Sequence, residues 1–185
     1  MNPTLGLRVK TGWAAVVLLG GTRQQPQVLD CREIRLSHWD RLHERQPYHA
    51  TFGVEQTDRA VIARLVKRVE RFARTALASL LREYAKAGHR VRRAAIVVSS
   101  LTDPASIANQ HMRAHASEGF MYRRVAVEGL ERKGLKTTVI VERDVLAQPA
   151  KVRRAVAELG VDAPRWRAEE KVAAAAAWLL LRTRR

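Results

Sequence analysis

The segment that most constrains the fold is the stretch from residue 5 to residue 19, LGLRVKTGWAAVVLL. Leu, Val and Trp dominate both halves of it, and these residue types favour β-strands. Lys10, Thr11 and Gly12 form a short break between the halves, where Gly12 supplies the positive φ that a tight turn needs. The segment therefore predicts an opening β-hairpin, so the domain must contain an antiparallel pair of strands.

Hydrophobic periodicity and capping residues predict three further strands and four helices. In chain order these are a strand over 27–36, a helix over 57–87, a buried strand over 91–100, a helix over 103–133, a strand over 136–142, a helix from 149 and a helix from 168. Asp58 and the pair Asp103-Pro104 are typical N-terminal residues of the two long helices. Residues 37–57 predict a polar loop between the third strand and the first long helix.

This order predicts the architecture of the domain. Three antiparallel strands followed by two helix-linked strands favour a mixed five-stranded sheet with helices on both faces, an α/β fold. A chain of 185 residues is long enough for one such domain and short for two. We therefore expect a single domain over residues 1–185.

Three residues of the second long helix carry expectations of their own. Gly119 lies in its middle, where glycine costs about 1 kcal/mol against alanine, so we expect the helix to approach a neighbour closely there. Met112 and Phe120 are expected to lie in the core.

The chain is strongly basic. Its 34 Lys and Arg residues exceed its 18 Asp and Glu residues, giving a formal net charge of +16. Such a charge attracts polyanions, nucleic acid first and acidic membrane or protein surfaces second, although an Arg-rich composition alone is the alternative. On the first long helix, the face opposite the apolar stripe carries Arg59, Arg64, Lys67, Arg68, Arg71, Arg74 and Arg82. This face predicts either a phosphate-binding surface or an ordinary solvated one.

The single cysteine and the apolar runs indicate a compartment. Cys31 alone excludes an internal disulfide and a cysteine-based zinc site, which fits a reducing environment. The longest apolar run, residues 172–181, is about half of what a membrane span requires, and no basic-then-apolar signal segment opens the chain. We expect a soluble cytoplasmic protein with no membrane partner.

A polar stripe on the second long helix is a candidate metal site. Residues at i, i+4, i+7 and i+11 share one helix face, and here they are His111, His115, Glu118 and Tyr122. Two His one turn apart with a nearby Glu can ligate a single transition metal. The alternative, which the pattern favours, is a half-buried polar stripe under the 37–57 loop. The Glu that follows the first His in a metalloprotease helix is absent.

Four segments in this order resemble ribonuclease H-like domains and, among these, Holliday-junction resolvases of the RuvC type. GLRVKTGWAAVVLL resembles their opening hairpin, and RRAAIVVSSL resembles the fourth strand, which normally ends in a catalytic Glu. HASEGFMYRRVAVEGLERKGLKTTVIV resembles the passage from helix to fifth strand, and WRAEEKVAAAAAWLLL resembles the closing helix, whose first turn normally carries two carboxylates. The resemblance covers nearly the whole chain and implies the ribonuclease H-like fold.

The activity that this resemblance implies is two-metal phosphodiester hydrolysis, in which carboxylates hold two divalent ions about 4 Å apart. Carried over to this sequence, the site is nearly empty. The first-strand Asp corresponds to Arg8, and the fourth-strand Glu falls at Ser99 or Ser100. Only Glu170, with Glu169 beside it, remains where the last helix should supply carboxylates. Because a guanidinium repels metal ions and only donates hydrogen bonds, the usual nuclease mechanism should be absent.

Three functions follow from these observations. The favoured one is a catalytically degenerate resolvase-like domain that binds nucleic acid, DNA rather than RNA, through Arg8, Lys10, Arg64, Lys67, Arg68, Arg71, Arg74 and Arg123. The second is a hydrolase or nuclease, either with one metal at His111, His115 and Glu118 or with Glu170 as a general base. The third is a scaffold or homodimerisation module without a ligand. No cofactor is required by the favoured function, and a divalent metal remains open.

Overall fold

The computed structural model describes residues 2–51, 53–160, 163 and 165–181. Its central sheet has five strands in the order β3-β2-β1-β6-β7. Their bounds are β1 Thr4–Lys10, β2 Trp13–Gly21, β3 Pro26–Arg35, β6 Arg93–Val98 and β7 Lys136–Val141. β1, β2 and β3 form an antiparallel meander, whereas β6 and β7 run parallel to β1. The predicted mixed five-stranded sheet is therefore confirmed.

The opening hairpin sits at the centre of this sheet. Gly12 has φ +88°, the left-handed conformation that its tight turn requires. β1 is hydrogen-bonded on one side to β2 and on the other to β6, and all its residues except Lys10 are buried. Alternation along the strand sends Leu5, Leu7 and Val9 to one face of the sheet and Gly6 and Arg8 to the other.

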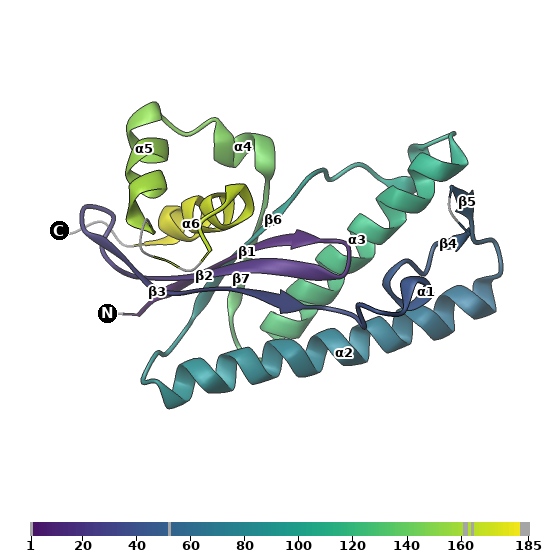
Figure 1. The fold of residues 1–185 in the computed structure, drawn as a ribbon, viewed down its shortest axis with the longest axis horizontal. Helices are drawn as coiled ribbons and strands as arrows, with labels where there is room; N and C mark the ends of the chain where they lie inside the picture. Colours follow the sequence, from purple (N-terminus) through teal and green to yellow (C-terminus); the bar gives the residue numbers. More distant parts are fainter. Residues whose placement is uncertain (1, 52, 161–162, 164, 182–185) are drawn as a thin grey trace.

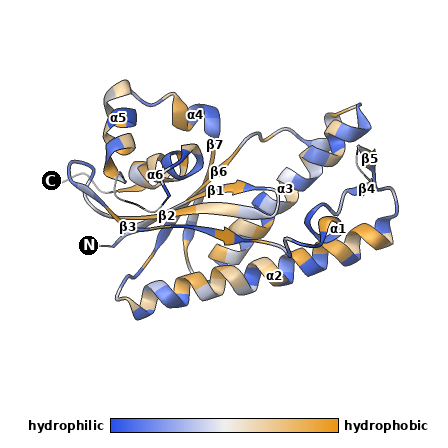
Figure 2. Ribbon diagram, in the orientation of Figure 1, coloured by the Kyte–Doolittle hydropathy of each residue, from blue (hydrophilic) through white to orange (hydrophobic). Residues whose placement is uncertain are grey.

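Helices cover both faces of the sheet, as the sequence predicts (Figure 1). α2 (Arg59–Lys86) and α3 (Gln110–Glu131) pack on the face that holds Leu5 and Leu7. α4 (Glu142–Leu146), α5 (Ala150–Leu159) and α6 (Ala168–Leu180) cover the opposite face. The alternating hydrophilic and hydrophobic residues along α2 in Figure 2 correspond to its inward apolar stripe and outward basic face. None of the described helices is long and apolar enough to cross a membrane.

The Ala-rich helix α6 packs directly on the central strand. A Cβ atom added at Gly6 would lie 1.9 Å from the carbonyl oxygen of Ala173, so only glycine fits there. Thr4 donates a hydrogen bond from Oγ1 to the carbonyl oxygen of Ala177, 2.9 Å away, farther along the same helix. These contacts bring the first turn of α6 to the carboxyl end of β1.

The second long helix starts later than predicted. Asp103 and Pro104 open only a 3₁₀ turn, η1 (Pro104–Ser106), and Ile107 then adopts an extended conformation. α3 begins at Gln110, where the Asn109 side chain accepts a hydrogen bond from the Met112 amide. The capping signal at Asp103 was real, but it caps a single turn because the chain must first cross from the sheet to the helix.

The expectations for three residues of α3 were wrong. A Cβ at Gly119 would meet nothing within 4 Å, and the close approach occurs instead at Gly129, beside Leu77. Met112 is 56% exposed and Phe120 is 44% exposed. The N-terminal half of α3 extends beyond the edge of the sheet (Figure 1), and its buried residues, Ala114 and Glu118, do not share the exposed positions of Met112 and Phe120.

Residues 37–57 are more ordered than a polar loop. They contain the short helix α1 (Leu42–Arg45) and a two-stranded hairpin, β4 (His49–Thr51) and β5 (Val54–Glu55). The Tyr122 hydroxyl of α3 donates a 2.8 Å hydrogen bond to the Arg45 carbonyl oxygen, and Arg113 pairs with Glu55 at 2.5 Å. The segment is therefore fastened along α3, beyond the carboxyl edge of the sheet.

Candidate functional site

Arg8 occupies the carboxyl end of the central strand and is only 1% exposed. Its Nη2 atom lies 2.5 Å from Oε2 of Glu142, the residue that follows β7, and 3.2 Å from Oγ of Ser99, which follows β6. Its Nε atom lies 3.3 Å from Oε2 of Glu169 in the first turn of α6. That last contact is an ion pair outside hydrogen-bond geometry. Arg8 therefore joins four elements of the fold through its guanidinium.

The carboxylates around Arg8 differ from those that the sequence singled out. Glu169 faces Arg8 and also pairs with Lys10, with 2.9 Å between Oε1 and Nζ. Glu170 is buried elsewhere, and its Oε2 accepts a 3.0 Å hydrogen bond from the Arg167 amide at the start of α6. Its contact is that of a helix-capping residue. Glu142, which sequence reasoning missed, completes the set, and its position directly after a parallel strand was the available signal.

Charge at this end of the sheet is internally balanced. Arg8 and Lys10 supply two cations, and Glu142 and Glu169 supply two carboxylates, so the four side chains sum to zero. The guanidinium lies between the carboxylates of Glu142 and Glu169. It repels divalent cations, and it occupies the carboxylate oxygens that would otherwise bind them. This donor set does not fit a pair of Mg²⁺ ions, which would need several unpaired carboxylates.

Beside this ion-pair network, a cavity of about 220 Å³ opens between the strand ends and α3. Lys10, Ser99 and Ser100 line its strand side, and Phe120 and Arg123 line its helix side. The Arg123 guanidinium carbon lies 4.7 Å from the centroid of the Phe120 ring, a cation–π contact. The cavity thus presents a guanidinium and an exposed aromatic ring, together with an ammonium group that is paired with Glu169.

The predicted basic face of α2 is exposed. Arg64, Lys67, Arg71 and Arg74 all lie on the surface. Arg68 differs, because its Nη1 atom pairs with Glu44 of α1 at 2.6 Å. Within the part of the chain that the structure describes, no carboxylate pairs with Lys67 or Arg71, which leaves these charges available to an external anion.

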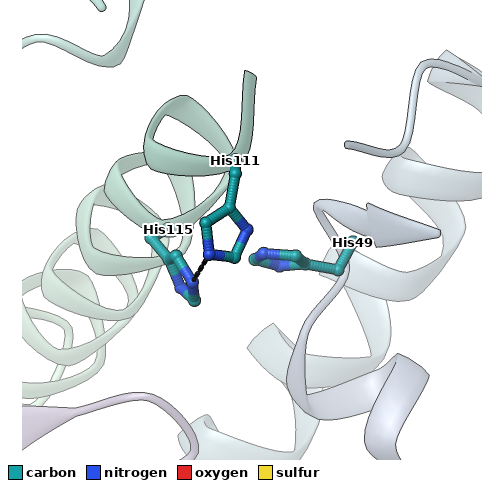
Figure 3. Close-up of side chains that lie close together, drawn as sticks. All are labelled: His49, His111 and His115. Carbon is teal, nitrogen blue, oxygen red and sulfur yellow. Dashed lines mark hydrogen bonds between the residues drawn. The ribbon is translucent and has the colours of Figure 1, made fainter. Parts of the chain in front are cut away.

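Three histidines form a second cluster (Figure 3). His111 and His115 stand one turn apart on α3 with their Nε2 atoms 3.2 Å apart, and His49 of β4 faces them. The ring centroid of His49 is 4.5 Å from that of His115 and 5.7 Å from that of His111. One nitrogen from each ring lies within 4.8 Å of the other two. The sequence pointed to His111 and His115; His49 was missed because it comes from a distant segment.

Glu118 contacts the cluster through His49. It is fully buried, and its Oε1 lies 2.7 Å from Nδ1 of His49. Burial raises the pKa of Glu118 to about 7, against the opposing effect of the hydrogen bond with His49. Desolvation and the neighbouring imidazoles of His49 and His111 lower the pKa of His115. The cluster borders a cavity of about 420 Å³ that also contacts Leu42, His43, Arg45, Gln46, Thr51 and Gly53.

Comparisons with known proteins place the fold. No protein-family model matches the chain, and a search of curated proteins found no match either. Among solved structures, RuvC of T. thermophilus in complex with a Holliday junction substrate aligns with a TM-score of 0.58 at 11% identity, covering 96% of this chain and 91% of that one. The Thermus thermophilus RuvC structure aligns with a TM-score of 0.55 at 12% identity, covering 95% and 90%.

The fold is RuvC-like. This finding confirms the ribonuclease H-like architecture that the four sequence segments implied. At this level of identity the comparison concerns the fold alone, so the chemistry must come from the residues of this chain. The sequence resemblance implies catalytic carboxylates at the ends of two strands. In this chain those strand ends hold Arg8 and Ser99.

Proposed function

We propose that this protein is a nucleic-acid-binding, RuvC-like domain without two-metal nuclease activity. One observation carries the proposal: a buried arginine, Arg8, lies where the resemblance implies a metal-binding carboxylate, and it is paired with Glu142 and Glu169. The guanidinium of Arg8, together with Lys10, thereby neutralises the carboxylates of Glu142 and Glu169 within the protein. The cavity of about 220 Å³ beside the Arg8 network, called the cleft below, lacks the groups that hydrolysis by two metals requires.

The charge distribution supports binding of a polyanion. The chain carries a net charge of +16, and Lys67 and Arg71 present charges on α2 that pair with no carboxylate of the described residues. In the cleft, Lys10 and Arg123 stand beside the exposed ring of Phe120, on which a nucleobase can stack. Arg8 contributes differently from the other predicted binding residues, because a buried and paired guanidinium orders the cleft instead of contacting phosphate.

DNA is the preferred polyanion in this proposal. The solved RuvC structure that aligns over most of the chain is described as bound to a Holliday junction substrate. We infer that branched or duplex DNA is the ligand that this domain binds. Contacts of this kind go mainly to phosphates, so they give affinity with little sequence preference.

Fluorescence anisotropy with labelled four-way junction, duplex and single-stranded DNA tests this function. We expect binding at about 50 mM salt that weakens steeply at about 200 mM salt, because phosphate contacts release counterions. Absence of binding to all three DNA forms at the lower salt concentration would refute the proposal.

A cleavage assay tests the loss of nuclease activity separately. The same three substrates are incubated with Mg²⁺ or Mn²⁺, and we expect no cleavage above the background of a protein-free control. Cleavage above that background would contradict the proposal, and its loss in a Glu142→Gln or Glu169→Gln variant that circular dichroism shows to be folded would assign it to the carboxylates.

A further inference from the structure

The three-histidine cluster lies outside the Arg8 network, although His115 also lines the cavity beside that network. We propose that His49, His111 and His115 bind one divalent transition-metal ion, zinc first, and that Glu118 positions His49 for it. Imidazole nitrogen suits zinc and its transition-metal neighbours, whereas Mg²⁺ prefers oxygen ligands.

The spacing of the nitrogens fits such an ion. Zinc–nitrogen bonds of about 2.0–2.1 Å in a tetrahedral site place ligand nitrogens about 3.3 Å apart. The Nε2 atoms of His111 and His115 are already 3.2 Å apart, and the third nitrogen lies within 4.8 Å of both. A metal ion would replace the hydrogen bond between these two rings and bring the third nitrogen into its coordination sphere.

His49 is oriented for metal binding by Glu118. Its Nδ1 is engaged by the carboxylate at 2.7 Å, which leaves Nε2 as the nitrogen available to a ligand. His49 is only 7% exposed, and its Nε2 has no hydrogen-bond partner among the described residues. A buried ring nitrogen without a partner is costly, and a metal ion would satisfy it. The chain carboxylate–histidine–metal is the arrangement by which outer carboxylates fix ligating histidines.

Three protein ligands leave the fourth position open. The cluster borders the cavity of about 420 Å³, so a water molecule or a small ligand can complete the coordination. The ligands also come from two elements, β4 and α3. Metal binding at this site therefore fastens the 37–57 segment to the N-terminal half of α3, which extends beyond the sheet.

Metal titration of the full chain tests this site. The purified protein is stripped with a chelator, dialysed, and titrated with Zn²⁺ by calorimetry, with Mg²⁺ titrated in parallel. We expect one Zn²⁺ per chain and no Mg²⁺ at this site, and Co²⁺ should give the intense visible bands of a four-coordinate ion. A wild-type protein that binds no Zn²⁺ would overturn the proposal.

Substitutions assign the ligands. His115 is exposed, so His115→Ala should keep the fold, as circular dichroism can check, and lose stoichiometric Zn²⁺ binding. His111→Gln is a second variant, and His89→Ala, outside the cluster, is the matched control that should bind as the wild type does. Retention of full binding by both cluster variants would overturn the assignment.

The role of Glu118 has its own readout. Glu118→Gln keeps the shape of the side chain and removes the carboxylate that orients His49. We expect one Zn²⁺ still to bind, with its affinity lowered 10–100-fold. Unchanged affinity would exclude the positioning role of Glu118. The DNA-binding measurement of the proposed function is separate, so either proposal can fail without the other.

Discussion

At the scale of single residues, Arg8 decides what the carboxyl edge of the sheet can do. Removing a charged partner from a buried ion leaves that ion without compensation, which costs far more than breaking an exposed pair. Arg8 has two carboxylate partners, Glu142 and Glu169, that are 31% and 28% exposed. The guanidinium is thus the least hydrated member of the network and the one most dependent on the others.

This dependence predicts a non-additive loss of stability. Glu142→Gln and Glu169→Gln should each lower the free energy of unfolding by about 1 kcal/mol, because one carboxylate still compensates Arg8. The double variant should lose about 3–5 kcal/mol, more than the sum, because it strands a buried charge. Urea denaturation measures all three. Asp144→Asn, which breaks an exposed pair with Arg143, is the control and should change stability by less than about 1 kcal/mol. An additive result would contradict the shared role of the carboxylates.

Cys31 gives a prediction that depends on pH. Burial, together with the nearby carboxylates of Glu170 and Asp30, raises the pKa of Cys31 to about 11, and its Sγ donates to the Arg165 carbonyl oxygen at 2.9 Å. At pH 8 the folded thiol should therefore alkylate roughly a hundredfold more slowly than an ordinary thiol, because the thiolate reacts. Mass spectrometry of native and urea-unfolded protein measures this ratio, and equal rates would contradict it.

The free energy of unfolding should also fall as pH rises from about 9 to about 11, since only the unfolded Cys31 thiol ionises there.

At the scale of elements, the contact between α6 and β1 sets the position of the ion-pair network. The helix approaches the strand at Gly6, where the Ala173 carbonyl group of α6 fills the space that a side chain on the strand would need. This approach carries Glu169 to Arg8 and Lys10. The Ala-rich composition of α6 is explained by the same contact, since small side chains let the helix lie close to the sheet.

Two glycine substitutions test this account. Gly6→Ala should lower the free energy of unfolding by at least about 2 kcal/mol, because its Cβ would overlap the Ala173 carbonyl oxygen. Gly119→Ala, where a Cβ meets nothing within 4 Å, should raise it by about 1 kcal/mol through helix propensity. Thermal and urea unfolding measure both. A neutral Gly6→Ala variant would show that α6 can move away from β1 without cost.

At the scale of the whole molecule, the candidate functional residues lie at one end of the fold. The N-terminal halves of α2 and α3 extend beyond the carboxyl edge of the sheet, together with residues 37–57 (Figure 1). The cleft with Lys10, the basic residues Lys67 and Arg71, and the histidine cluster all belong to this end. The proposed DNA contacts therefore lie at this end.

The salt dependence of DNA binding should follow this polarity. Lys67→Ala/Arg71→Ala should weaken DNA binding and make it less dependent on salt. The magnitude of the slope of log affinity against log salt should fall by about 2, one for each lost phosphate contact. Lys133→Ala/Lys136→Ala removes the same charge at the amino edge of the sheet and is the matched control. Anisotropy titrations at several salt concentrations measure both slopes. Equal losses in the two variants would indicate attraction by net charge alone.

Much of the fold was predictable because its signals are local. The hairpin turn at Gly12, the buried strands and the cap at Asp58 each depend on neighbours within a few residues. The start of α3 was misplaced because Asp103 and Asn109 both carry capping signals, and only the path from β6 to the helix selects between them. The 37–57 segment was missed as structure because its short elements are stabilised by contacts with α3.

The sequence by itself determined the order of the five sheet strands and the main helices, and it places Arg8 and Ser99, not carboxylates, at two strand ends, because residue identity and periodicity are carried along the chain. Tertiary structure alone decided which groups meet. Glu142 reaches Arg8 across 134 positions, and His49 reaches Glu118 across 69, since sheet pairing and helix packing bring distant segments together. Burial, which leaves Arg8 dependent on its partners and His49 Nε2 without one among the described residues, likewise exists only in the folded molecule.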